Sequence, residues 1–189
     1  MKGFQPLELG AVPSVRSKKD IMKKEIPIVT FKVRELGKWK NVTTAELFDD
    51  KRVVVFSLPG AFTPTCSLKQ LPNFERLYDE FITKGCNDVY CMSVNDSFVM
   101  NAWADEHKIN RVKMIPDGNG HFTRRMGMLV NKTHLGFGMR SWRYAMIVND
   151  HSIEQWFEEP GINDQGIDGD PYIETTPEKV LDKLSKTLH

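Results

Sequence analysis

The sequence has few cysteines, no long apolar run and no excess of charge of one sign. Its 189 residues include three cysteines, and 26 basic side chains nearly balance 25 acidic ones, for a formal net charge of +1. This balance removes any global electrostatic reason to bind nucleic acid or an anionic membrane surface, so we expect neither partner. No stretch approaches the roughly 20 apolar residues that span a bilayer. The longest apolar cluster, Val53–Leu58, has the length of a strand.

The first residues also lack the apolar core of a secretory signal, which favours a cytoplasmic location. Residues 1–24 carry more Lys and Arg than Asp and Glu, so a targeting segment for an organelle is the alternative. We expect 1–24 to be an N-terminal extension and 25–189 to form one globular domain.

The cysteine pattern excludes two further classes of protein. Cys66, Cys86 and Cys91 form no CxxC pair, and no Cys and His residues have the spacing of a zinc site. An odd, low count without a secretory signal also argues against a disulfide framework. We therefore expect no metal site and no cofactor, and at least one free thiol.

Strand and helix patterns alternate along the chain. A β-branched run, Ile26–Val33, is followed by Trp39–Val42 across Gly37, which predicts an N-terminal β-hairpin. Nearly continuous apolar runs, typical of strands buried on both faces, are Arg52–Leu58, Asp88–Val94 and Tyr144–Val148.

Other elements complete an α/β architecture. We expect short helices or strands at 43–48, 68–81, 95–108, 112–115, 153–157 and 176 onward, with Pro72 bending or restarting its helix. The simplest fold for this order and length is thioredoxin-like, with a central mixed β-sheet flanked by helices.

The most informative segment is SLPGAFTPTC, residues 57–66. A buried strand runs into a Pro/Gly loop, and Cys66 then lies in the first turn of a helix. Active sites of α/β sheets lie at the carboxyl ends of strands, and a helix start presents unpaired N–H groups and a positive dipole end. The alternative for Cys66 is a small buried core residue, the commonest state of a free cysteine.

A reactive thiol at this place needs more than the helix. A free cysteine with a pKa of about 8.5 is only about 3% ionised at pH 7, and ionising about nine-tenths of it requires roughly 3.4 kcal/mol. A helix N-terminus supplies at most about 2 kcal/mol. The sequence therefore predicts a nearby cation.

The segment resembles a known family. The spacing Pro59-x3-Thr63-x2-Cys66 matches the active-site motif of peroxiredoxins, and PGAFTPTCS is similar to their type-5 branch, also called type II. The resemblance continues through three further segments in the family's order: Ser93–Val99, Pro116–Gly120 and Gly136–Tyr144.

The resemblance implies a role for each matched residue. Cys66 would attack the peroxide and become a sulfenic acid, Thr63 would hydrogen-bond the peroxide, and Pro59 would shield the pocket from water. Arg143 would be the activating cation, stabilising the thiolate and the charge on the leaving oxygen. Arg140, three residues upstream, is the competitor for that role.

Two departures from the family affect the cycle. Gln70 stands where many relatives have histidine, and an amide does not titrate near pH 7. No cysteine follows Cys91, so the downstream resolving disulfide of some relatives is impossible. Cys91 is expected to be a buried core thiol and Cys86 an exposed or half-exposed loop thiol that could be glutathionylated.

The resemblance therefore implies a one-cysteine peroxidase. It would reduce hydrogen peroxide and alkyl hydroperoxides, with glutathione and glutaredoxin as the first candidate reductant and thioredoxin as the second. Such an enzyme would serve cell redox homeostasis and antioxidant defence. A homodimer is also implied, joined through the Phe137–Trp142 segment. The alternatives are a redox sensor that passes its Cys66 sulfenic acid to a partner, and a thioredoxin-like binding module without chemistry.

Overall fold

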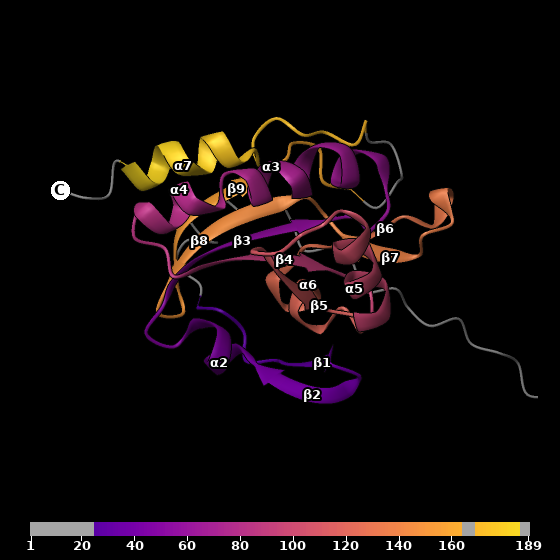
Figure 1. Cartoon of the computed structure of the whole chain (residues 1–189). Helices are drawn as coiled ribbons and strands as arrows, with labels where there is room; N and C mark the ends of the chain where they lie inside the picture. The colour runs from indigo at the N-terminus through magenta and orange to yellow at the C-terminus, as the bar shows by residue number, and fades with distance from the viewer. Residues whose placement is uncertain (1–24, 164–168, 186–189) are drawn as a thin grey trace, which may run out of the picture.

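A mixed five-stranded sheet forms the centre of the computed structural model, which describes residues 25–163 and 169–185 (Figure 1). The strand order is β5–β4–β3–β8–β9. Three strands run parallel, namely β3 (Arg52–Leu58), β4 (Asp88–Ser93) and β5 (Lys113–Pro116). Next to β3, β8 (Tyr144–Asn149) runs antiparallel, and β9 (Ser152–Glu158) pairs antiparallel with β8. The predicted mixed sheet is confirmed.

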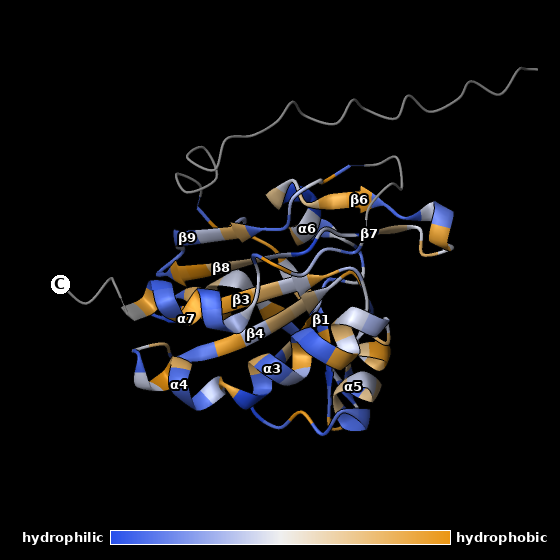
Figure 2. Cartoon of the chain, turned by 90° about the horizontal axis from the view of Figure 1, so that it is seen from above, coloured by the Kyte–Doolittle hydropathy of each residue, from blue (hydrophilic) through white to orange (hydrophobic). Residues whose placement is uncertain are grey.

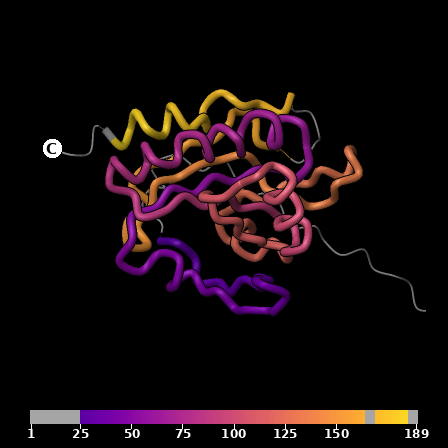
Figure 3. The backbone as a smooth tube through the Cα atoms, in the orientation of Figure 1, coloured from indigo at the N-terminus to yellow at the C-terminus, as the bar shows by residue number. Residues whose placement is uncertain are grey.

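Helices and the predicted N-terminal hairpin cover opposite faces of this sheet. The helices α3 (Leu71–Arg76), α4 (Tyr78–Thr83) and α7 (Pro177–Ser185) lie on one face. The hairpin of β1 (Thr30–Glu35) and β2 (Lys38–Thr43) lies on the other. Figure 3 shows the indigo hairpin and the yellow C-terminal helix on opposite sides of the central strands.

The alternation along β3 explains its continuous apolar sequence. Val53 and Val55 belong to the hydrophobic cluster under the hairpin, whereas Val54, Phe56 and Leu58 belong to the cluster under α3, α4 and α7. Successive side chains of a strand point to opposite faces, so a sheet covered on both sides needs apolar residues at every position. In Figure 2 the central strands are mainly orange, while the covering helices alternate between blue and orange.

The helix after the active-site motif, whose loop spans residues 59–63, is irregular. It begins at Pro64, forms the π-helical turn η1 (Cys66–Gln70), and continues as α3. Pro72 lies at the start of α3 and has no N–H to donate to the preceding turn. The helix therefore restarts at α3, as the sequence predicted.

Short elements complete the fold. The predicted short helix at 43–48 is α2 (Thr44–Phe48), which starts with a capping box between Thr43 and Glu46. The helix α5 (Ser97–Glu106) buries Met100 and Trp103. The sequence did not predict four short elements: α6 (His121–Met126), the 3-10 turn η2 (Thr133–Leu135), and the paired strands β6 (Leu129–Asn131) and β7 (Met139–Ser141). None of these short segments has a continuous apolar run or a side-chain cap that would mark it in the sequence.

Two predictions concern residues that the structure does not describe. The N-terminal extension, 1–24, lies outside the described ranges, so the domain boundary and the targeting alternative stay predictions. Within the described ranges, no helix is both long enough and apolar enough for a membrane span.

Candidate active site

Cys66 lies where β3 leaves the sheet. The strand ends at Leu58, the chain passes through a loop, and the helix that begins at Pro64 carries Cys66 in its first turn. The loop is fixed to β4, because the side-chain Oδ1 of Asn95 accepts hydrogen bonds from Ala61 N at 3.0 Å and from Ser93 Oγ at 2.7 Å. Cys66 itself is 0% exposed.

Thr63 and Pro59 flank this cysteine in the loop. Pro59 is buried, and Thr63 is half-buried. The Thr63 hydroxyl donates to Gly60 O at 2.8 Å. Its single proton is therefore committed, and its oxygen is left as an acceptor. An O–H group that approaches Cys66 from this side would meet an acceptor.

Arg143, which directly precedes the neighbouring strand β8, reaches Cys66. Its Nη1 lies 3.4 Å from Sγ of Cys66, and its side chain is 2% exposed. The antiparallel register of β3 and β8 pairs Ser57 with Tyr144, so the residue before Tyr144 lies at the carboxyl end of β3. The sheet thus brings together two residues that are 77 positions apart.

The guanidinium of Arg143 stays cationic at this buried place. Burial lowers its pKa, but the negative charges of Cys66 and Asp170 and their hydrogen bonds raise it, and the net pKa lies above the ordinary value. An arginine that cannot release its proton is a permanent positive charge beside Sγ. This geometry provides the cation that the ionisation argument requires.

Arg140 occupies a different place. Its Nε donates to Phe137 O at 3.0 Å, and its Nη1 donates to Val94 O at 2.8 Å. These bonds hold the side chain against backbone carbonyls beside the active-site loop. Of the two arginines, Arg143 is therefore the one that contacts Cys66.

Gln70 adds a fixed amide to the site. It is 0% exposed, and its Oε1 accepts a hydrogen bond from Nη1 of Arg143. Rotating the amide by half a turn would bring Nε2 against the same donor, so the orientation is determined by Arg143. Within the described residues, Nε2 has no hydrogen-bond partner.

Several neighbours of Arg143 were not anticipated. Its Nη2 pairs with Asp170, its Nε donates to Pro171 O at 3.0 Å, and its guanidinium carbon lies 5.7 Å from the centre of the Tyr172 ring. None of these three residues is among the site residues that the sequence predicts. Their contacts depend on the tertiary fold, and the sequence offers no local signal for them.

The other two cysteines are both buried. Cys91 on β4 is 0% exposed, as predicted, and burial together with the charge of Cys66 raises its pKa well above the ordinary value. The prediction of an exposed Cys86 is wrong, because that side chain is 4% exposed and packs in the cluster beneath α3 and α4. Gly85, with φ +87°, turns the chain back toward the sheet, so Cys86 follows the turn into the core. None of the three forms a disulfide.

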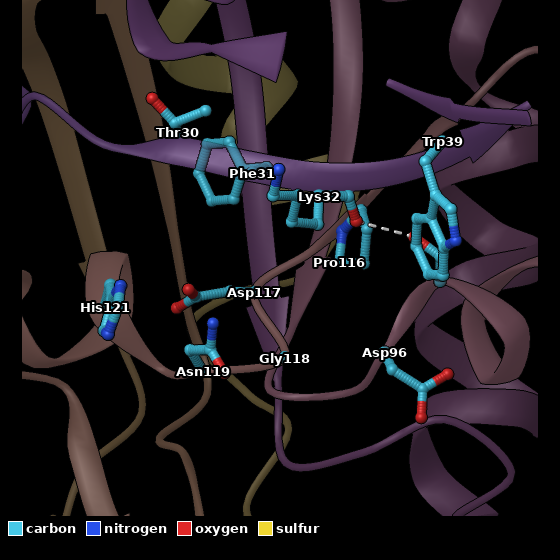
Figure 4. A pocket seen from close by; sticks show the side chains of 11 residues that line it. Thr30, Phe31, Lys32, Trp39, Asp96, Pro116, Asp117, Gly118, Asn119 and His121 are labelled. Carbon is cyan, nitrogen blue, oxygen red and sulfur yellow. Dashed lines mark hydrogen bonds between the residues drawn. The ribbon is translucent and has the colours of Figure 1, made fainter. Parts of the chain in front are cut away.

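A separate pocket opens on the hairpin side of the molecule (Figure 4). Its lining includes Lys32, Trp39, Asp117 and His121, and it includes neither Cys66 nor Arg143. The Asp117 carboxylate is already occupied by Phe122 N and by the N and Oγ1 of Thr123. We assign no chemistry to this pocket.

Comparisons with known proteins show which sequences and folds this chain resembles. The sequence model of the Redoxin family matches residues 23–170. The chain is 55% identical over 172 residues to a peroxiredoxin of Sinorhizobium fredii, covering 86% of this chain and 91% of the relative. In structure it resembles the Plasmodium falciparum antioxidant protein, a 1-Cys peroxiredoxin, with a TM-score of 0.80 and 35% identity over 87% of this chain and 99% of the other. It also resembles reduced Prx3 from Vibrio vulnificus in complex with H2O2, with a TM-score of 0.77 and 32% identity over 85% and 96% of the two chains.

Proposed function

This chain belongs to the peroxiredoxin family within the redoxins, and from that membership we propose a one-cysteine thiol peroxidase cycle centred on Cys66. The observation that carries the proposal is the 3.4 Å contact between Nη1 of Arg143 and Sγ of Cys66. It places a permanent cation within hydrogen-bond distance of the Cys66 sulfur. The substrates proposed are hydrogen peroxide and alkyl hydroperoxides.

In the first step the Cys66 thiolate attacks one peroxide oxygen. The S–O bond forms as the O–O bond breaks, sulfur is oxidised to the sulfenic acid, and the leaving oxygen departs as an alkoxide or hydroxide that takes up a proton. Arg143 is suited to stabilise the thiolate and then the negative charge on the leaving oxygen. Thr63 is suited to accept a hydrogen bond from the O–H of the peroxide, because its own proton is donated to Gly60 O. Pro59 would limit the access of water.

In the second step an external thiol reduces the sulfenic acid. Glutathione attacks the sulfur, forms a mixed disulfide and releases water; a second thiol, delivered by glutaredoxin, then regenerates the Cys66 thiolate. Cys91 and Cys86 are poor resolving thiols, because burial raises both pKa values and keeps them protonated at neutral pH. Thioredoxin is the second candidate reductant. The 1-Cys relative supports a cycle without a second cysteine.

We further propose that two copies associate through the surface beside the active-site loop. Phe62, Leu135 and Met139 expose 54%, 54% and 44% of their surfaces there. Trp142, which lies in the segment implied by the resemblance, is 2% exposed within the single chain and is a core residue. Sedimentation equilibrium of the full chain tests this proposal, and a monomer at all concentrations contradicts it.

The function is tested by steady-state consumption of hydrogen peroxide with two reducing systems. We expect sustained turnover with glutathione, glutaredoxin and glutathione reductase, and slower turnover with thioredoxin and its reductase. The reverse order would reassign the reductant. If the protein consumes one equivalent of peroxide and shows no turnover in either system, the proposal of a peroxidase is contradicted and a redox sensor is favoured.

A further inference from the structure

A segment near the C-terminus holds Arg143 from the side opposite Cys66. Asp170 pairs with Nη2, the carbonyl of Pro171 accepts from Nε at 3.0 Å, and the Tyr172 ring lies against the guanidinium at 5.7 Å. In Figure 1 the yellow segment before α7 runs on the same face of the sheet as α3. Three consecutive residues therefore contact one side chain.

The shape of the guanidinium makes these contacts consequential. The group is planar and rigid, and its N–H donors have fixed directions. When Nε and Nη2 are both anchored, the direction of Nη1 is determined as well. Nη1 is the nitrogen that contacts Cys66 and Gln70. The contacts of Nε and Nη2 thus fix the direction of Nη1, the donor that contacts Sγ of Cys66.

The segment is itself fixed by a buried carboxylate. Glu159 is 0% exposed and accepts hydrogen bonds from the backbone N–H groups of Ile173, Glu174 and Thr175 and from the Thr175 hydroxyl, at 2.8–2.9 Å. Hydrogen bonds to an ionised acceptor are stronger than neutral ones. The segment is therefore held at one place.

Glu159 is also tied to Arg143 through the backbone. It follows β9 and donates its N–H to Arg143 O at 3.2 Å. Glu159 consequently fixes the backbone of Arg143 directly and its side chain through the segment that ends at Thr175.

We propose that residues 170–175 form a strap that aims Arg143 at Cys66, with Asp170 and Glu159 as positioning residues for the peroxidase reaction. The inference rests on the proposed function of Cys66 and Arg143. It assigns to Asp170 a geometric role, because its side chain is 45% exposed and water screens its charge, whereas its hydrogen bond retains its direction.

The principal test compares Asp170→Ala and Asp170→Asn with Glu174→Gln. Glu174 is the matched control, because it lies in the same strap with 49% of its side chain exposed but pairs with Lys179 instead of Arg143. Two quantities are measured for each variant of the full chain: the rate constant of Cys66 oxidation by hydrogen peroxide, and the pH profile of Cys66 alkylation read by peptide mass spectrometry.

We expect Asp170→Ala to slow oxidation about 10-fold, because a small misplacement of a catalytic donor has a large kinetic effect. Its alkylation profile should move to higher pH. Asp170→Asn keeps an acceptor oxygen, so its oxidation rate should fall less than that of Asp170→Ala. Asp170→Glu should also oxidise faster than Asp170→Ala. The control, Glu174→Gln, should have the wild-type rate. In an Arg143→Ala background, Asp170→Ala should cause no further loss.

Other outcomes would overturn the proposal that the strap positions Arg143. A wild-type rate and profile for Asp170→Ala would show that Asp170 does not position Arg143. Faster oxidation in both Asp170→Ala and Asp170→Asn would show that its charge competes with Cys66 for the guanidinium. The alkylation profile decides this point even if hydrogen peroxide does not oxidise wild-type Cys66, a result that would instead refute the proposed function.

Glu159→Gln gives a second, independent test. Its amide brings N–H donors toward the backbone N–H groups of the strap, so we expect a lower melting temperature together with the same shift of the alkylation profile to higher pH. A lower melting temperature with an unchanged profile would mean that Glu159 is only structural.

Discussion

Nη1 of Arg143 lies 3.4 Å from Sγ of Cys66, although 77 positions separate the two residues. One belongs to the first helical turn after β3, and the other directly precedes β8. Because β8 runs antiparallel to β3, its first residue is opposite the last residues of β3, and the side chains of Cys66 and Arg143 meet at the carboxyl end of β3.

Replacing Cys66 by Ser should reduce peroxide consumption to the uncatalysed rate, because a serine hydroxyl does not ionise near neutral pH and cannot form a sulfenic acid. The measurement is steady-state turnover with glutathione and glutaredoxin. As controls, Cys86→Ser and Cys91→Ala should keep turnover. If Cys91→Ala consumes one equivalent of peroxide and then stops, Cys91 is a resolving cysteine and the one-cysteine cycle is wrong.

Replacing Arg143 by Ala should lower the rate constant for Cys66 oxidation by about 10²–10³, which is the usual effect of removing one preorganised donor from a developing anion. The thiolate fraction at pH 7, measured by alkylation, should fall too. Arg143→Lys should recover little, since an ammonium cannot reproduce the planar fork.

The matched control for Arg143 is Arg140→Ala. Arg140 donates to the carbonyls of Phe137 and Val94, so this variant should keep most of the rate. A large loss in Arg140→Ala together with a small one in Arg143→Ala would reverse the assignment of the two arginines.

Replacing Thr63 by Val should slow oxidation about 10-fold or more, because the valine keeps the shape of the side chain but removes the acceptor for the peroxide O–H and the bond to Gly60 O. Thr63→Ser keeps the hydroxyl and should retain most of the activity. Stopped-flow measurement of the oxidation rate separates the two variants. Equal rates for Val and Ser would exclude a role for the hydroxyl.

Cys86 should make folding stability depend on alkaline pH. Burial raises the pKa of its thiol from 9.0 to about 11, with smaller opposing effects of Arg52 and Glu154. Below pH 9 the Cys86 thiol is protonated in both the folded and the unfolded chain, so its burial takes nothing from the folding stability there. Between pH 9 and 11 the unfolded chain loses the proton first, and stability falls as pH rises.

The size of this effect is roughly 1 kcal/mol at pH 10. Urea unfolding of the wild type and of Cys86→Ala at pH 8 and pH 10 measures it, because the alanine variant should lose less stability over this interval. Identical losses in the two proteins would mean that Cys86 ionises equally in the folded and unfolded states.

Much of the fold follows from local patterns. The continuous apolar run of β3 predicts a strand covered on both faces, and the Thr43 and Glu46 pair predicts a helix cap. Pro72 predicts the interruption that the π-helical turn η1 accommodates. Such signals act within a few residues, where the backbone and its nearest side chains decide the conformation.

Cys86 shows where local pattern fails. A cysteine after Gly85 at the end of a helix is typical of an exposed loop, yet its side chain is 4% exposed. Whether a residue after a turn faces water or the sheet depends on the direction in which the chain leaves the turn. That direction is set by packing against distant strands.

The sequence by itself predicted Cys66 as the nucleophile, because the strand, loop and helix start that surround it are contiguous and their chemistry is local. The sequence also favoured the proposal of a one-cysteine cycle, since this sequence has no cysteine after Cys91. The family resemblance implied Arg143 as the cation, and the tertiary structure decided which side chains contact the sulfur and Arg143. The register of β3 and β8 brings Arg143 to Cys66, and the segment fixed by Glu159 brings Asp170 to Arg143. Contacts across such separations depend on strand pairing and burial, which no local pattern encodes.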